Sequence, residues 1–225
     1  MNIEESSWDW VRDHESLCIS FTQGVSPKGL IAKYGADPET AVMAAWGEVF
    51  ETLDPKPDSS ILRVGVMGSW SFCLESLGTL GTRQEILSSL SQNTETIMVC
   101  LGTGGYDTAS YWSNGQLCEA FEPGQPSTLL IEQKCGFWEA TESRRLQTRA
   151  PSAAISALEV ASDITTGQIT ADTATGALLS IALAWQKSAS PLGSSITSSS
   201  LAKNVQLGPH LGELRLSGSS DESPN

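Results

Sequence analysis

The amino-acid sequence predicts an α+β domain in which helices pack on an antiparallel sheet of about five strands. Two stretches have the two-residue side-chain period of a β-strand, and they surround the two-residue turns Gly68-Ser69 and Asn114-Gly115. This pattern is typical of β-hairpins. A third stretch, "TIMVCLG", is apolar on both faces, as a central strand should be. Helical patterns stand before and after these strands without a βαβαβ alternation, which disfavours a parallel sheet.

The sequence ahead of the first hairpin carries helical patterns. "SSWDWVRDHES" opens with serines that can cap a short helix, and "LCISF" after it fits either a buried strand or a continuation of that helix. In "SPKGLIAKYG", Ser26 is the expected cap, Pro27 takes the first helical position and Gly35 ends the helix. "ADPETAVMAAWGEVFETL" repeats this pattern from Asp37 and Pro38, and its apolar spacing predicts one amphipathic helix.

Counting outward from each turn gives the register of the two hairpins. In the first, a glycine opposite a phenylalanine leaves room for the ring to lie across the neighbouring strand. The expected pairs there are Met67 with Trp70, Gly65 with Phe72, Val64 with Cys73, and Leu62 with Glu75. In the second hairpin they are Trp112 with Leu117, Ser110 with Glu119, Thr108 with Phe121, and Asp107 with Glu122.

The rest of the chain is predicted to be mostly helical. Thr82 and Glu85 have the spacing of a capping box at the start of "GTRQEILSSLSQ". After "PGQP" ends the last strand, a helix is expected from Thr128 to Phe137, with "TESRRLQTRAPS" as a polar connector behind it. "AAISALEVAS" is short and weakly amphipathic, whereas "ITADTATGALLSIALAW" has the spacing of a clear helix. The serine, glycine and proline content after Lys187 predicts a single domain over residues 1–187 and a disordered tail over 188–225.

Four motifs of the chain are distinctive: "FTQGVSPKGLIAKYGAD", "GSWSFCLES", "GTRQEILSSLSQNTETI" and "GQLCEAFEPGQP", the last of which contains "AFEPG". They resemble motifs of a family of small actinobacterial domains of unknown function. The resemblance runs from about Trp8 to about Pro126 and is weaker as far as Trp185. It implies a fold and no mechanism, and it suggests that "GSWSFCLES" and "AFEPG" characterise the domain.

Composition and charge narrow the classes of function. The formal net charge is −13, and residues 1–60 hold 11 acids against 4 bases. An acidic field repels phosphate backbones, which disfavours nucleic acid as a partner, and it speeds encounter with a basic protein. The alternative is that the charge only keeps the protein soluble. No apolar run is long enough for a membrane span, and the acidic start "MNIEESSWDW" lacks the pattern of a signal peptide, so we expect a cytoplasmic protein.

The residues that commonly hold metals or cofactors are sparse. The five cysteines form no CxxC motif, and only two histidines are present, so we expect buried reduced thiols and no metal site. "LGTGGY" has neither the GxxxxGK[ST] nor the GxGxxG spacing of a phosphate loop, and we expect no cofactor.

Three acids are the candidates for catalysis. Asp107 and Glu122, if directly opposed, either fray the end of the hairpin or share a cation or a proton, and a shared proton would suit acid–base chemistry. Glu75 is expected to be half buried opposite Leu62. There it is either a third catalytic acid or a sheet-edge acid held by Arg63 or Arg83.

Two tryptophans beside the hairpin turns are the candidates for binding. Trp70 and Trp112 fit core positions, although tryptophan is also enriched at binding surfaces, and Arg83 is grouped with them as a binding residue. Two hypotheses follow. The first is a non-enzymatic binding or regulatory module for a protein partner, for example in an immunity or anti-toxin role. The acidic charge of the chain favours a basic partner. The second is an enzyme that uses carboxylate acid–base chemistry on a small molecule, for instance in specialised metabolism.

Overall fold

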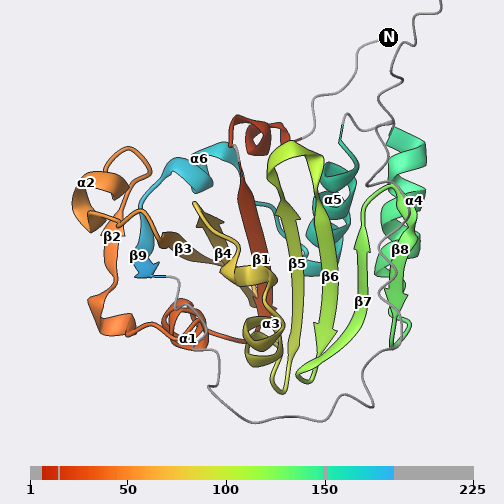
Figure 1. Ribbon diagram of the computed structural model, residues 1–225, viewed down its shortest axis with the longest axis horizontal. Helices are drawn as coiled ribbons and strands as arrows, with labels where there is room; N and C mark the ends of the chain where they lie inside the picture. Colours follow the sequence, from red (N-terminus) through yellow and green to blue (C-terminus); the bar gives the residue numbers. More distant parts are fainter. Residues whose placement is uncertain (1–6, 15, 149–151, 185–225) are drawn as a thin grey trace, which may run out of the picture. The chain divides into compact units, whose positions relative to one another are not determined.

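The computed structural model describes residues 7–14, 16–148 and 152–184, which contain one nine-stranded antiparallel sheet (Figure 1). The strand order is β2-β9-β3-β4-β1-β5-β6-β7-β8. The α+β class and the antiparallel sheet are confirmed, but the expected number of about five strands was wrong. The sequence patterns did not predict strands β2, β8 and β9, and they left open whether β1 is a strand or part of a helix.

The bounds of the elements are as follows. The strands are β1 (Leu17–Gln23), β2 (Val42–Ala44), β3 (Ser59–Met67), β4 (Trp70–Ser76), β5 (Glu95–Leu101), β6 (Thr108–Ser113), β7 (Gln116–Glu122), β8 (Gln125–Ile131) and β9 (Leu178–Ala184). The α-helices are α1 (Pro27–Lys33), α2 (Val49–Leu53), α3 (Gln84–Leu90), α4 (Phe137–Thr148), α5 (Ala153–Thr165) and α6 (Ala171–Thr175). Short 3₁₀ helices are η1 (Asp9–Asp13), η2 (Pro38–Thr40), η3 (Leu80–Thr82) and η4 (Thr103–Gly105).

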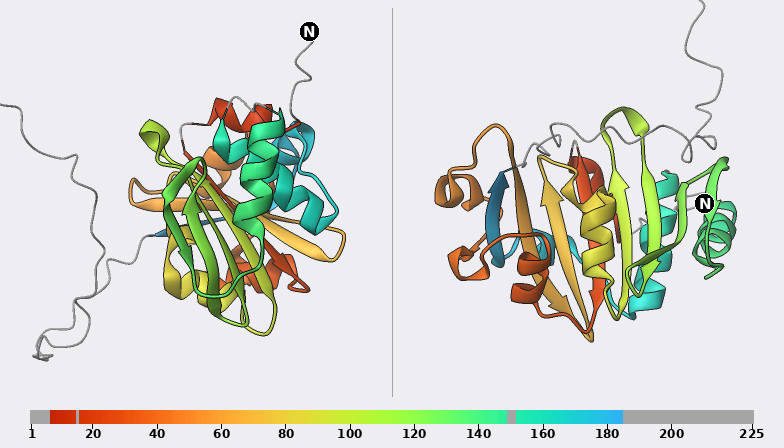
Figure 2. Two further views of the ribbon diagram at one scale, coloured as in Figure 1. Left: turned by 90° about the vertical axis from the view of Figure 1, so that its right-hand side faces the viewer. Right: turned by 60° about the horizontal axis from the view of Figure 1, so that its bottom comes forward.

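Helices cover both faces of the sheet. Helices α1 and α3 lie on one face, and α4 and α5 lie on the other (Figures 1 and 2). Strand β1 shows the consequence, because its side chains alternate between two separate cores. Leu17, Ile19 and Phe21 belong to the core that contains α5, whereas Cys18 packs with residues of α1 and α3. "LCISF" is therefore an interior strand with both faces buried.

Several predictions from local chemistry are confirmed. Ser26 Oγ accepts a hydrogen bond from the Gly29 N–H at 3.1 Å and caps α1. The four residue pairs expected for the first hairpin are all present between β3 and β4. "TIMVCLG" forms β5, which lies inside the sheet between β1 and β6.

The amphipathic helix expected from "ADPETAVMAAWGEVFETL" was wrong. Asp37 and Pro38 do begin a helical turn, but it is the single 3₁₀ turn η2, and the chain then forms β2 and the short helix α2. The cause is pairing with a distant segment, because β2 aligns with β9 and Met43 lies opposite Leu179. Such long-range pairing overrides local helix propensity.

The C-terminal predictions were wrong for a related reason. Gly124 adopts a left-handed φ of +85° after β7, and the chain reverses into β8 instead of forming a helix at Thr128. The expected polar connector is most of α4. The clear helix expected in "ITADTATGALLSIALAW" is α6 followed by β9, which pairs with both β2 and β3.

Two smaller expectations also need correction. The Thr82–Glu85 capping box does not form, since Thr82 Oγ1 instead donates to the Thr79 carbonyl at 2.8 Å, although α3 itself is present. In the second hairpin Trp112 faces Leu117 as expected, but a bulge between Tyr111 and Trp112 shifts the later pairs by one residue. The expected tail over residues 188–225 lies outside the described residues. None of the helices in the described part of the chain has the length and hydrophobicity needed to cross a bilayer.

Candidate functional site

Glu75 is fully buried in the middle of the sheet. Its Oε1 atom accepts hydrogen bonds from Ser60 Oγ and the Leu80 N–H, and its Oε2 atom accepts one from the Gly81 N–H, all at 2.6 Å. Burial raises the pKa of Glu75 above its ordinary value, and the three donors reduce this rise. The expected half-buried position at a sheet edge was therefore wrong, because the turn η3 and a serine hold this carboxyl in the interior; of the two expected arginines, Arg83 acts on Glu75 only through its positive charge, which lowers the pKa.

The space around Glu75 is closely packed. A Cβ atom added at Gly81 would lie 3.0 Å from Glu75 Oε2, 3.0 Å from Cys18 Sγ and 2.9 Å from the Tyr34 hydroxyl oxygen. Burial also raises the pKa of the Tyr34 hydroxyl and of the Cys73 thiol well above their ordinary values. These groups form a buried polar cluster beneath η3, and Glu75 lines neither of the two pockets described below.

Arg63 points to the opposite face from Glu75. Its guanidinium donates to the backbone carbonyls of Ala44 (3.3 Å), Gly176 (2.6 Å) and Ala174, and it lies 5.5 Å from the centroid of the Trp46 ring. Consecutive residues of a strand point to opposite faces of the sheet. Leu62 lies opposite Glu75, so Arg63, the next residue, points away from Glu75 and does not pair with it. Arg63 instead joins β2, α6 and the start of β9.

Trp70 and Trp112 are buried on opposite faces of the sheet. Trp70 is 4% exposed and belongs to the core that contains α5. Trp112 is 5% exposed, belongs to the core of α1 and α3, and donates its indole N–H to Ser110 Oγ at 3.1 Å. Both rings occupy the core positions that the hairpin geometry predicts, and they do not share one sheet face.

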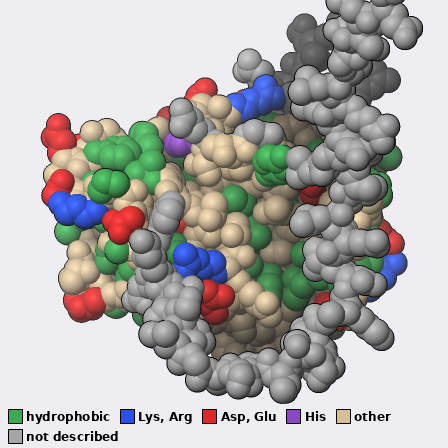
Figure 3. Space-filling model, in the orientation of Figure 1, with side chains coloured by type: hydrophobic (Ala, Val, Ile, Leu, Met, Phe, Trp, Pro, Cys, Tyr) green, Lys and Arg blue, Asp and Glu red, His purple; other side chains and the backbone are tan. Residues whose placement is uncertain are grey.

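A hollow of about 420 Å³ lies beside α3 on the face of β5 to β8 (Figure 3). We call it the β6–β8 hollow. Among the described residues, eight apolar residues, four residues with a hydroxyl group and one acid line it. They are Leu87, Met98, Ala109, Trp112, Leu117, Ala120, Phe121 and Leu130, then Thr82, Thr108, Ser110 and Thr128, then Glu122. Its volume falls in the range of small-ligand sites.

The hollow brings several of the predicted residues into one region. Glu122 lines it, and Asp107 comes directly before Thr108, which also lines it. Arg83 is half buried at the N-cap of α3, next to Thr82 at the rim. Glu75 and Trp70 do not line this hollow.

Asp107 and Glu122 interact without being directly opposed. The bulge sets Ala109 opposite Phe121, so the predicted rung between the two acids does not form. Burial raises the pKa of Asp107, a hydrogen bond from the Gly102 N–H lowers it, and the negative charge of Glu122 raises it further. The charge of Glu122 therefore affects the ionisation of Asp107, and an acid of this kind beside a pocket could exchange a proton with a ligand.

Glu119 is a buried acid whose structural role sequence reasoning missed. Its Oε1 atom accepts hydrogen bonds from the N–H groups of Cys135 and Gly136, and its Oε2 atom accepts one from that of Trp138, all at 2.8 Å. Burial opposes ionisation, but the three donors prevail, and the pKa of Glu119 lies below its ordinary value. Glu119 thus fixes the start of α4 against β7.

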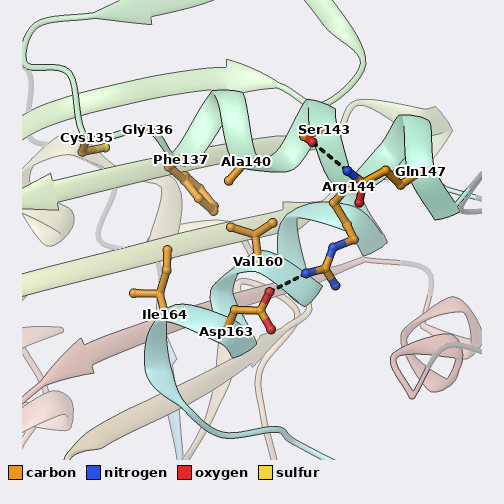
Figure 4. Close-up of a pocket in the computed structure, with 10 residues that line it drawn as sticks. All are labelled: Cys135, Gly136, Phe137, Ala140, Ser143, Arg144, Gln147, Val160, Asp163 and Ile164. Carbon is orange, nitrogen blue, oxygen red and sulfur yellow. Dashed lines mark hydrogen bonds and ion pairs between the residues drawn. The ribbon is translucent and has the colours of Figure 1, made fainter.

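A second pocket, of about 520 Å³, lies between α4 and α5 (Figure 4). Its floor is apolar, with Phe137, Val160 and Ile164, and at one end Arg144 Nη2 lies 2.5 Å from Asp163 Oδ2. Cys135 lies at the other end, where partial desolvation raises the pKa of its thiol to about 12; its side chain is exposed, so the expectation of buried thiols is wrong for this residue and holds for the other four cysteines. The paired charges and the protonated thiol give this pocket no reactive group.

The edge of the sheet formed by β2 carries exposed apolar side chains in an acidic setting. Met43 is 64% exposed, Phe50 44% and Val42 38%. We call these three residues the edge patch. Six acids and a single lysine stand between Asp37 and Asp58, and Glu48, Glu51 and Asp58 are exposed and form no ion pair within the described residues. Figure 3 shows hydrophobic side chains next to acidic ones at the left of the view, where β2 and α2 lie.

The described residues contain no group of three or more His, Cys, Asp or Glu side chains arranged to hold a metal ion. In comparisons with known proteins, residues 4–131 match the model of one family, described as a family of unknown function (DUF6461). No curated protein and no solved structure matches the chain.

Proposed function

The chain belongs to the family of unknown function DUF6461, whose description assigns no activity, and we propose that it is a non-enzymatic module that binds a basic protein through the edge patch. The observation that carries this proposal is the exposure of Val42 and Met43 on the uncharged outer strand β2, together with that of Phe50 on the following helix α2. Strands at sheet edges present unpaired backbone groups, and proteins that do not use them usually protect them with charge or proline.

The two edges of the sheet differ in this protection. Strand β8 contains Pro126, and its pairing with β7 is irregular between Ala120 and Glu122. Strand β2 contains neither proline nor a charged residue. An extended segment that pairs with β2 would cover Val42 and Met43, which point to opposite faces of the strand.

The charge around the edge patch favours a basic partner over nucleic acid. Glu48, Glu51 and Asp58 would face lysine or arginine side chains that flank the pairing segment, whereas they would repel phosphates. A role as an immunity or regulatory protein against a basic target is consistent with this chemistry.

Affinity capture with matched variants tests the proposal. The full chain is immobilised as wild type, as Met43→Lys, and as Ile164→Lys, a control that puts the same charge at an exposed apolar residue on α5. We expect wild type and Ile164→Lys to retain the same basic protein at low salt, and Met43→Lys to lose it. A partner that binds all three chains equally, or an acidic partner, would refute the proposal.

A second candidate function is supported by the coupling between Asp107 and Glu122 at the β6–β8 hollow. An enzyme of this kind would use one carboxyl as acid and the other as base on a small molecule. Glu75 would have no part in it, because η3 and Ser60 enclose that side chain. A turnover that Glu122→Gln abolishes and Met43→Lys leaves unchanged would favour the enzyme over the protein-binding module.

A further inference from the structure

The β6–β8 hollow combines an apolar lining with a single charge. Trp112, Leu117 and Leu130 are among its apolar lining residues, and Glu122 is the only charged residue among the described residues that line it. Apolar pockets that hold one convergent charged group select ligands with an apolar body and one opposite charge.

The carboxylate of Glu122 is available to a ligand. It takes part in no ion pair or side-chain hydrogen bond with the rest of the described chain. Its backbone is held in place, since the Glu122 N–H donates to Thr128 Oγ1 at 2.9 Å and Thr128 Oγ1 donates to the Gln125 carbonyl at 2.8 Å. The acid therefore stands half buried at the rim on an anchored turn.

Asp107 adds to the negative potential at this rim. It lies close enough to Glu122 for the two charges to interact, and its Oδ1 atom accepts only a long hydrogen bond of 3.3 Å from the Gly102 N–H. A cation placed between the two carboxyls would relieve their repulsion. The indole ring of Trp112 in the lining also suits a cation, because the face of an aromatic ring attracts positive charge.

We propose that the β6–β8 hollow is a binding site for a compact organic cation, an amine or quaternary ammonium group on an apolar body. The apolar body contacts Leu130 and the neighbouring apolar lining, and the charged group lies at Glu122. The site is at the other end of the sheet order from the edge patch, so it does not depend on the protein-binding proposal.

Titration with three probes of similar size and different charge tests the site. Benzyltrimethylammonium, benzyl alcohol and phenylacetate are each added to the full ¹⁵N-labelled chain, and amide and indole shifts are followed by NMR. We expect saturable binding of the cation with shifts centred on Trp112 and Leu130, weaker binding of the alcohol and none of the anion. Equal binding of all three probes, or shifts confined to the α4–α5 pocket, would overturn the proposal.

Two charge-neutralising variants separate a local effect from the overall charge. Glu122→Gln should weaken the binding of the cation about five-fold or more, as expected when a partly desolvated ion pair with an aromatic neighbour is lost. Asp172→Asn removes the same charge from exposed α6 and should leave the affinity unchanged. If both variants weaken binding equally, the cation senses only the net charge and the site is refuted. Unchanged NMR spectra of the free variants establish that each is folded.

Discussion

Two buried glutamates have pKa values that are shifted in opposite directions. Each accepts three hydrogen bonds, but the pKa of Glu75 is raised and that of Glu119 is lowered. Glu75 has a serine and two backbone donors deep in the sheet, whereas all three donors to Glu119 are backbone N–H groups at the start of α4. Burial prevails at the first site and hydrogen bonding at the second.

We predict opposite pH dependences for Glu75→Gln and Glu119→Gln. Because the folded-state pKa of Glu75 is raised, its contribution to stability is full below the ordinary value of 4.5 and is lost as the pH rises through the folded pKa. The contribution of Glu119 is full above 4.5 and is lost as the pH falls through its lowered folded pKa.

Urea denaturation between pH 3 and pH 8 measures this difference, at about 1.4 kcal/mol for each unit of pKa shift. The free energy of unfolding of wild type minus that of each variant should slope downward with pH for Glu75 and upward for Glu119. Slopes of the same sign would contradict the two assignments.

The ionisation of Asp107 should depend on its neighbour. The charge of Glu122 contributes to the raised pKa of Asp107, so Glu122→Gln should move the Asp107 pKa down toward its ordinary value. Titration of the carboxyl carbon by NMR measures the shift, with Asp172→Asn as the control. An unchanged Asp107 pKa in Glu122→Gln would show that the two acids act independently.

Arg63 is the residue on which the β2 end of the sheet depends. It is 2% exposed, and its guanidinium serves three backbone carbonyls while it stacks on Trp46. Arg63→Met would keep most of the apolar stem but leave those carbonyls unpaired, and we expect a loss of about 2–4 kcal/mol in the free energy of unfolding.

Hydrogen exchange locates the effect of Arg63→Met. Faster exchange should be confined to β2, α6 and β9, and β5 should keep its protection. A uniform rise in exchange across the sheet would show that Arg63 supports the whole core and not this end alone.

At the scale of elements, short-range patterns were predictable and long-range pairings were not. The cap at Ser26 and the pairs around Gly68-Ser69 depend on residues close in sequence, and the structure confirms them. Strands β2 and β9 depend on each other across more than half of the chain. Their apolar spacing fits a helix equally well, so only the partner strand decides between the two.

The candidate site was predictable to the same extent. Trp112 and Leu117 lie next to the Asn114-Gly115 turn and pair as counted, but the bulge beyond them displaces the expected rung of Asp107 and Glu122. A bulge leaves no sequence signal here, since no glycine marks it. The hollow itself needs α3 and β8 as walls, and the second half of β8, from Thr128, was expected to begin a helix.

Gly65 provides a test of the hairpin packing. A Cβ atom at this position would lie 2.7 Å from Cε1 of the Phe72 ring and 3.1 Å from Leu178. We therefore expect Gly65→Ala to lower the free energy of unfolding by about 1–3 kcal/mol through overpacking. Gly47→Ala is the control, because nothing lies within 4 Å of a Cβ atom there. Equal stability of the two variants in urea denaturation would contradict the close approach of the ring.

At the scale of the whole molecule, two cores on the two faces of the sheet are built from residues 8–181. Phe137 and α5 close one face, and α1 and α3 close the other. The described residues therefore bury both faces of the sheet in two cores of their own.

Removal of residues 188–225 should accordingly leave the melting temperature unchanged. Calorimetry of the shortened and full chains at equal concentration measures this, and the capture experiment repeated with both chains shows whether partner binding needs the C-terminal residues. A fall of many degrees on shortening would refute the proposed domain boundary.

The position of β9 also sets an order of events during synthesis. This strand is the last described element of the chain, yet it lies between β2 and β3, whereas the match to the family ends at residue 131. A nascent chain that has emerged only that far lacks the neighbour of β3 and the whole of α5. The pairing of β9 with β2 and β3 can therefore form only after translation has passed Ala184.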